Sequence, residues 1–227
     1  MEWVGRQSAS QSSNPTYDDW LQAYTCPPFF SDDWLNEWLD AKAAAGTAGA
    51  AAVEPDATGT AGSGGAPVAC SDYRFVYLGP AGTRTGLHAD VLRSFSWSAN
   101  VAGRKRWRLL PPRYSHLLRD RHGRGCAPDF GSGGGGASGG TGEGEEEEGE
   151  YPGLAEARRH VVEVEQGPGA ALFVPSGWHH TVENLEATLS VNHNWINGCG
   201  VHRTWALLAR EREEAAAAIE DCRALCR

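Results

Sequence analysis

The sequence predicts a mainly β domain of the jelly-roll class, because short alternating segments recur along the chain and turn signals separate them. The clearest alternation lies in residues 94–101, where aromatic and aliphatic side chains fall on one face and small polar side chains on the other. Gly79-Pro80 and Pro111-Pro112 supply two of the breaks. The other expected strands are residues 73–78, 105–110, 161–165, 170–174, 180–185 and 188–196.

The N-terminal segment, residues 1–40, is expected to be an aromatic and partly helical piece that packs on the barrel. Residues 31–39 are typical of a short capped helix, with an apolar stripe formed by Trp34, Leu35 and Trp38. We interpret this stripe as core packing, and a docking patch for a partner is the alternative. Residues 41–66 are mostly Ala, Gly and Thr, and are expected to be a flexible insertion.

Residues 67–200 are expected to form the main domain, which carries the functional motifs. Within it, residues 121–150 are rich in Gly and then in Glu, and we expect a disordered loop because little there can bury apolar area. Residues 201–227 are rich in Ala, Glu, Arg and Leu, which predicts a terminal helix. Without the two biased tracts, 26 and 30 residues long, 171 of 227 residues remain, enough for one domain with a core.

Charge and cysteine content restrict the class of protein. The net charge is −9, but six glutamates lie in residues 143–150, and without them 20 positive side chains face 23 negative ones. No basic excess is left to recruit nucleic acid. Six cysteines without a C-x-x-C pair indicate free thiols in a reducing compartment. The chain shows no secretory signal and no apolar run near the roughly 20 residues that span a bilayer. We therefore expect a soluble cytoplasmic protein, with the nucleus as an alternative.

Two distant stretches combine into one predicted metal site. The first is His88-Ala89-Asp90, and the second ends in His179-His180. Two imidazoles and one carboxylate cover one face of an octahedral metal and leave three positions open, as non-haem Fe(II) oxygenases require. A zinc hydrolase, which can use the same ligand types, is the main chemical alternative. Strand parity selects His180, because it shares a face with the apolar Val182.

Lys105 is the next candidate residue. Alternation places it on one face with Trp107 and Leu109, and a buried ammonium is costly unless it meets an anion. The alternative is a lysine that snorkels from the rim of the barrel. Asn192 and Asn194 fall on the polar side of the last expected strand, where they could orient a bound molecule or could bond to nearby backbone. The residues leave both choices open.

Together with residues 94–112 and 188–195, these motifs resemble the Jumonji-C family of iron- and 2-oxoglutarate-dependent oxygenases. Within that family the likeness is to the branch called Jumonji-domain-containing protein 4, and it covers residues 17–40, 71–115 and 155–200. The resemblance implies a double-stranded β-helix, which is a cupin-like jelly-roll, as the catalytic domain. The family also carries further strands ahead of the aromatic segment, for which the 16 residues before Tyr17 leave little room.

The resemblance also implies the site and its reaction. Fe(II) would be held by His88, Asp90 and His180, and 2-oxoglutarate would chelate it through the 2-oxo acid end. Lys105 and Thr85 would hold the far carboxylate of this cosubstrate. Further cosubstrate contacts would come from Asn192, Asn194 and a serine, for which we take Ser98 with Ser96 as the alternative. Dioxygen would be consumed as succinate and CO₂ form and oxygen enters a C–H bond.

The implied reaction is protein hydroxylation, and the branch acts as a lysyl hydroxylase on the eukaryotic translation termination (release) factor. The expected partner is therefore a protein substrate, without direct nucleic-acid or membrane binding. Two other functions remain open, a Jumonji-type lysine demethylase and a non-catalytic cupin-like module that binds metal. The residues do not indicate an oligomeric state.

Overall fold

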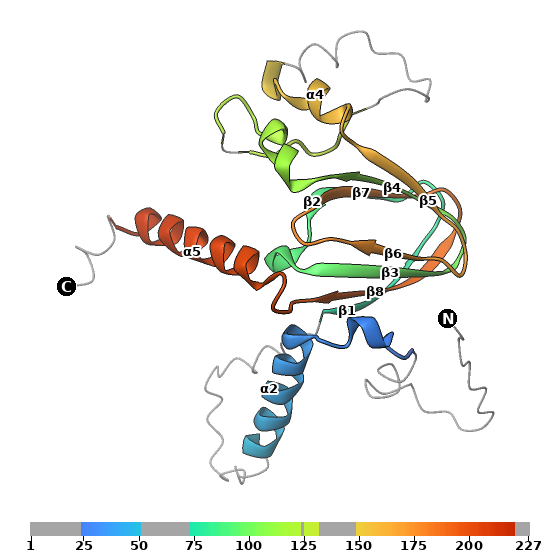
Figure 1. Ribbon diagram of the computed structural model, residues 1–227, viewed down its shortest axis with the longest axis vertical. Coiled ribbons are helices and arrows are strands. Elements are labelled where there is room, and N and C mark those ends of the chain that lie inside the picture. Colours follow the sequence, from blue (N-terminus) through green and yellow to red (C-terminus); the bar gives the residue numbers. More distant parts are fainter. Residues whose placement is uncertain (1–23, 51–72, 124, 132–148, 221–227) are drawn as a thin grey trace, which may run out of the picture.

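The computed structural model describes residues 24–50, 73–123, 125–131 and 149–220, and in them two four-stranded antiparallel sheets face each other (Figure 1). The first sheet has the order β1 (Arg74–Gly79), β8 (Thr188–Trp195), β3 (Phe95–Ala102) and β6 (Ala171–Val174). The second has the order β2 (Arg84–Ala89), β7 (His179–Asn184), β4 (Lys105–Leu110) and β5 (Val162–Gln166). The predicted jelly-roll is confirmed.

Helices lie outside this sandwich. They are η1 (Pro28–Phe30), α2 (Trp34–Ala50), η2 (Val91–Arg93), η3 (Pro112–Leu118), α4 (Leu154–Arg158) and α5 (Val201–Ala218). The C-terminal helix is thus confirmed as α5, and the predicted residues 221–227 lie outside the described part of the chain. Among the described helices, none combines the length and apolar character that crossing a bilayer requires.

The described part of the N-terminal segment, which begins at Tyr24, packs on the outer face of the first sheet. Trp97 on β3 is 1% exposed and lies 5.4 Å, ring centroid to centroid, from Tyr24 and 6.1 Å from Phe30. Because side chains alternate along a strand, Ser96 and Ser98 then face the space between the two sheets. The aromatic face of β3 therefore attaches the N-terminal segment, and its polar face is free to build a site.

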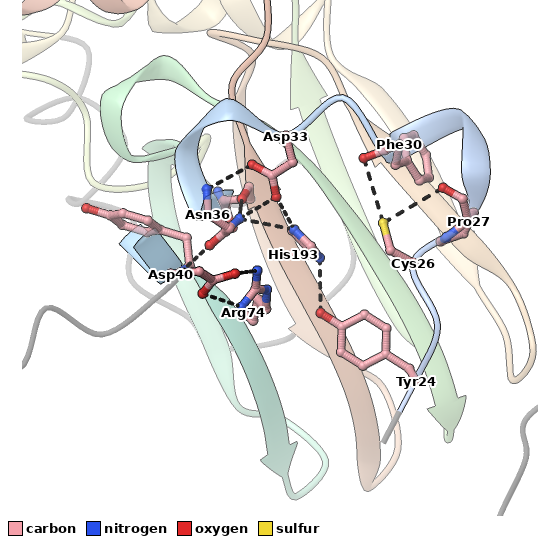
Figure 2. A network of polar contacts seen from close by, with 11 residues as sticks. Tyr24, Cys26, Pro27, Phe30, Asp33, Asn36, Asp40, Arg74 and His193 are labelled. Atoms are coloured by element: carbon pink, nitrogen blue, oxygen red, sulfur yellow. Dashed lines mark hydrogen bonds and ion pairs between the residues drawn. The ribbon is translucent and has the colours of Figure 1, made fainter. Parts of the chain in front are cut away.

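A buried polar network anchors the start of α2 to β8 (Figure 2). Asp33 caps the helix, since its Oδ1 accepts a hydrogen bond from the backbone N–H of Asn36 over 3.0 Å. Its Oδ2 lies 2.7 Å from Nε2 of His193, whose Nδ1 lies 3.0 Å from the Tyr24 hydroxyl. Burial alone would raise the pKa of Asp33, but its hydrogen bonds with His193 and Asn36 outweigh burial, so the pKa lies below its ordinary value.

Two expectations about this region are wrong. Trp34 and Trp38 are 48% and 55% exposed, and the buried apolar side chains of α2 among the described residues are Leu35 and Leu39, which pack with Ile196. The polar anchor at Asp33 fixes the rotation of the helix, and this rotation turns the leucines inward. Residues 41–50 are not a flexible insertion either, because α2 continues to Ala50, and residues 51–66 of that prediction lie outside the described residues. The run of alanines explains this extension, since alanine has the highest intrinsic helix propensity.

Part of the segment expected to be a disordered loop, residues 121–150, is ordered. Phe130 is 2% exposed and Ala127 is 1% exposed, and both belong to a core cluster with Leu110, Leu118 and Leu154. Burial of these side chains and the backbone hydrogen bond from the Ala127 N–H to the Leu118 carbonyl hold residues 125–131 against the domain and offset part of the entropy cost of ordering them. Residues 132–148, with most of the Glu run, lie outside the described residues.

Candidate metal centre

His88, Asp90 and His180 converge at one point between the two sheets. Strands β2 and β7 pair so that His88 lies directly opposite His180, and their ring centroids are 4.3 Å apart. Asp90 follows the end of β2, and one ligand atom from each of the three residues lies within 4.8 Å of the others. His180 is 3% exposed, as its predicted inward orientation requires. The structure therefore brings the three predicted ligands together.

Neighbouring groups orient these ligands for a metal. Nδ1 of His88 lies 2.8 Å from the carbonyl oxygen of Gly86, and Nδ1 of His180 lies 3.3 Å from that of Trp178. These acceptors assign the ring protons to Nδ1, so both Nε2 lone pairs are free. Asp90 accepts a hydrogen bond on Oδ2 from the hydroxyl of Ser96 over 2.7 Å, which leaves its Oδ1 available to bind a metal. Such outer contacts are the usual support of metal ligands, so the residues fit a divalent metal.

The ligands open into a cavity of about 270 Å³. Its wall includes four of the predicted cosubstrate residues, which are Thr85, Lys105, Asn192 and Asn194. Lys105 is 4% exposed, and its Nζ donates a hydrogen bond to the hydroxyl of Ser190 over 2.6 Å. Among the described residues, no carboxylate lies within ion-pair distance of this ammonium. Burial lowers the pKa of Lys105, because the charged form is poorly solvated there.

Comparison with known proteins agrees with this geometry. Residues 27–200 match the cupin-like domain family. The chain belongs to that family. The match begins at residue 27, so it includes η1 and α2.

Three relatives support the predicted Jumonji-C resemblance. The chain is 42% identical over 92% of its length to "Arginine-specific demethylase JMJ20" of Arabidopsis thaliana. It is 42% identical over 83% of its length to "2-oxoglutarate and iron-dependent oxygenase JMJD4" of Gallus gallus. A third, the "Bifunctional arginine demethylase and lysyl-hydroxylase psr-1" of Caenorhabditis elegans, is 32% identical over 62% of the chain. The chain spans 40%, 35% and 34% of the lengths of these relatives.

The serine contacts of this cupin-like site differ from the expectation. Ser98 is not among the residues that line the cavity, and its hydroxyl instead donates to Oδ1 of Asn192 over 3.0 Å. Ser96, the alternative, lines the cavity and contacts Asp90. Ser98 is two residues further along β3 than Ser96, so it shares the inward face but lies beyond the metal ligands. It therefore supports a wall residue and does not face the cosubstrate space.

Two residues that shape the cavity escaped prediction, Ser190 behind its wall and Tyr77 in it. Ser190, fully buried, holds the Lys105 ammonium and also donates to Asn192 over 3.2 Å. Tyr77 on β1 lines the cavity, with its ring centroid 6.0 Å from the same ammonium. Ser190 could have been found, since it precedes Asn192 by two residues and shares its polar face. Nothing in the local pattern of β1 distinguishes Tyr77 from an ordinary strand residue.

His179 lies outside the metal ligand set, as parity predicts. Its Nδ1 is buried without a hydrogen-bond partner among the described residues. Burial is the largest cause that lowers the pKa of His179 to about 4, followed by the positive charge of Arg93. The ring is therefore neutral at neutral pH and points to the side of β7 opposite His180.

Proposed function

We propose that this chain is the catalytic core of an Fe(II)- and 2-oxoglutarate-dependent protein oxygenase, and that it hydroxylates a lysine of the translation termination factor. One observation carries the oxygenase assignment. A metal site with open positions shares a cavity of about 270 Å³ with a buried lysine that has no carboxylate partner among the described residues.

The buried lysine favours an oxygenase over the zinc hydrolase alternative. Hydrolysis needs a metal-bound water and a base, and it gives no reason to keep an ammonium inside the sandwich. A dicarboxylate that binds the metal at one end needs a cation for its other end. Lys105 is one of only two lysines in the sequence, whereas the exposed ion pairs of β4 use arginine. A lysine at this buried position therefore indicates an anion that the protein itself does not supply.

In this assignment each wall residue has a physical role. Iron, when bound by His88, Asp90 and His180, would supply the activation of dioxygen coupled to cosubstrate decarboxylation. The Lys105 ammonium and the Thr85 hydroxyl would bind the far carboxylate of 2-oxoglutarate. The Asn192 and Asn194 amides would orient the part of the cosubstrate nearest the metal. The indole of Trp107, 5.6 Å from the His180 ring between centroids, would exclude water from the metal side of the cavity.

The choice of substrate rests on the branch that the chain resembles and on relatives named oxygenase and lysyl-hydroxylase. Arginine demethylation is the second candidate, because a relative of equal identity is named an arginine-specific demethylase. Both outcomes begin with oxygen insertion into a C–H bond of a protein side chain. We propose the cytoplasm as the place of action, since translation terminates there.

The test is aerobic incubation of the chain with Fe(II), 2-oxoglutarate and the purified termination factor, followed by peptide mass spectrometry and a formaldehyde assay. Hydroxylation predicts one added oxygen on a lysine-containing peptide and no formaldehyde. A parallel incubation uses a methylated arginine peptide, and loss of a methyl group with release of formaldehyde would favour the demethylase. If succinate forms but neither substrate is modified, both substrate assignments are wrong and the oxygenase assignment stands.

A further inference from the structure

A second groove lies on the far side of β7 from the metal, between η3 and α5. Figure 1 shows α5 and the segment after β4 extending from the same end of the sandwich. The groove has a volume of about 420 Å³, and its wall includes four arginines that come from three separate parts of the chain, Arg93, Arg119, Arg203 and Arg210. No carboxylate lines it. A concentration of like charge in a chain of net charge −9 calls for a physical explanation.

Three of these four arginines lack the ion pairs that the arginines beside the second sheet form. On the second sheet, Arg104, Arg106 and Arg108 all pair with glutamates of β5, β7 or the loop after β7. In contrast, Arg93, Arg119 and Arg203 form no ion pair with any residue that the structure describes. Arg210 has a single ion pair, 3.4 Å long, with Glu214 on its own helix.

The positive charges of these arginines also repel one another. Burial is the largest cause that holds the pKa of Arg93 below its ordinary value, and the charges of Arg210 and Arg119 lower it further. The negative charge of Glu211 offsets only part of this effect, so the clustered positive charges still cost free energy, which a bound anion would recover. Guanidinium groups suit this role because their planar fork binds carboxylates in a bidentate way.

The cationic groove continues into an apolar one. A neighbouring pocket of about 660 Å³ shares Pro112 and Arg203 with it, and its wall is rich in proline and aromatic rings, including Phe95, Pro111, Pro175 and Trp178. An occupant that fits both parts carries negative charge beside at least one apolar side chain. A peptide segment with aspartate or glutamate next to an aromatic or aliphatic residue has this chemistry.

Both grooves are connected to the metal centre through short stretches of backbone. Arg93 follows the ligand Asp90 by three residues, and Trp178 precedes the ligand His180 by two. Since His179 and His180 point to opposite sides of β7, an occupant of the groove lies beside the metal cavity and not within it. The groove can therefore hold a part of a macromolecule that is distant from the reacting side chain.

We propose that this groove, lined by Arg93, Arg119, Arg203 and Arg210, docks an acidic segment of the protein substrate. The proposal rests on the proposed function, since it takes the substrate to be a protein. Carboxylates of the segment would pair with Arg119, Arg203 and Arg210, and an apolar side chain would enter the adjoining pocket. The adjoining apolar pocket favours a peptide over a nucleic acid, because a peptide can place an apolar side chain beside its carboxylates.

The test measures binding of a fluorescently labelled glutamate-rich peptide with a central tryptophan, by anisotropy at low and moderate salt. The unmodified chain should bind it, and Arg203→Gln/Arg210→Gln should bind it about tenfold more weakly. Arg212→Gln removes an exposed charge of α5 that does not line either pocket, so it should bind like the unmodified chain. A peptide with glutamine in place of glutamate is the control for charge and should bind weakly.

Equal affinity of the Arg203→Gln/Arg210→Gln variant, or of the glutamine peptide, would overturn the proposal. Tighter binding of a single-stranded oligonucleotide than of the acidic peptide would overturn it in favour of nucleic acid. Succinate formation from Fe(II) and 2-oxoglutarate without peptide separates this proposal from the proposed function. If the unmodified chain forms succinate but ignores the peptide, only the docking proposal fails. If it forms none, the proposed function fails.

Discussion

The ammonium of Lys105 and the hydroxyl of Ser190 lie 2.6 Å apart in the interior of the sandwich, and both residues are buried. A hydroxyl is a weak partner for a buried ammonium compared with a carboxylate, because it carries no negative charge. The free protein therefore holds Lys105 in an unfavourable state that an incoming carboxylate relieves. This relationship makes Lys105 the residue that distinguishes a 2-oxoglutarate site from a generic metal site.

Lys105→Met should weaken binding of 2-oxoglutarate by roughly two to three powers of ten, because breaking a buried pair costs about 3–5 kcal/mol. Anaerobic titration in the presence of Fe(II) measures this affinity. Lys42→Met, at an exposed position of α2, is the matched control and should leave the affinity unchanged. A change of less than about threefold, under 1 kcal/mol, would show that Lys105 does not bind the cosubstrate.

The same substitution should stabilise the cosubstrate-free protein. Burial lowers the pKa of Lys105, so between its folded-state value and about 10.4 the unfolded chain binds more protons than the folded one. The destabilisation of the folded protein by the buried ammonium is therefore fully present below the folded-state pKa of Lys105. It fades as the pH rises from that value to about 10.4. Urea unfolding at neutral and at strongly alkaline pH should show that Lys105→Met raises the free energy of unfolding, and the increase should be larger at neutral pH. A loss of stability at neutral pH would contradict the uncompensated charge.

Ser96→Ala should lower the affinity for Fe(II) by about 10–100-fold without changing the ligand set. The Ser96 hydroxyl donates to Oδ2 of Asp90 over 2.7 Å, and such outer contacts orient a ligating carboxylate. Ser98→Ala is the matched control, since Ser98 lies on the same face of β3 and contacts Asn192 instead. Competition with a metal-sensitive dye measures both affinities. Equal affinities in the two variants would mean that the serine does not orient Asp90.

The two adjacent histidines should respond differently to the same substitution. His180→Gln should lose Fe(II) binding beyond the roughly 10–100-fold cost of losing an outer contact, because it removes a ligand. His179→Gln should retain Fe(II) binding, since its ring lies on the other side of β7. Calorimetric titration with Fe(II) under anaerobic conditions compares the two variants. Loss of binding in His179→Gln alone would reverse the ligand assignment.

Asp33→Ala should lower the free energy of unfolding by about 3 kcal/mol, because it removes the buried carboxylate that bonds to His193 and Asn36 and also removes the cap of α2. The pKa of Asp33 lies below its ordinary value in the folded protein, so the unfolded chain binds more protons. The stability that Asp33 supplies is thus fully present above about pH 4 and is lost as the pH falls through its folded-state pKa.

Urea unfolding of Asp33→Ala and of the exposed Asp32→Ala, from neutral pH to about pH 3, tests this account. Among the described residues, Asp32 accepts a side-chain hydrogen bond only from the exposed indole of Trp34, so its loss should cost less than about 0.5 kcal/mol. The difference between the two variants should shrink at the acid end. A difference that stays constant with pH would show that the ionised carboxylate of Asp33 does not anchor the N-terminal segment.

Local sequence patterns predicted the functional side chains that lie in one or two strands. The His88 and Asp90 motif, the parity of His180 and the alternation around Lys105 all need only a period of two residues. The same reasoning placed the tryptophans of α2 inward, because it did not include the Asp33 to His193 contact that sets the rotation of the helix.

Features that depend on long-range contacts could not be predicted in this way. Phe130 appeared within a glycine-rich tract, and only its contact with Leu118 and Leu154 shows that it belongs to the core. The arginine groove joins Arg93, Arg119 and Arg203, which are separated by 26 and 84 residues in the chain. No local periodicity connects such positions, so their proximity becomes visible only in the folded structure.

Anaerobic titration of the chain with Fe(II) and 2-oxoglutarate, followed by admission of dioxygen and measurement of succinate, tests the oxygenase assignment most directly. The visible charge-transfer absorption of the iron–cosubstrate complex should develop in the unmodified chain and be absent in Asp90→Ala, with succinate formed only by the former. Lys105→Met should develop the same absorption only at much higher 2-oxoglutarate concentration. Absence of both absorption and succinate in a folded, iron-loaded unmodified chain would contradict the assignment.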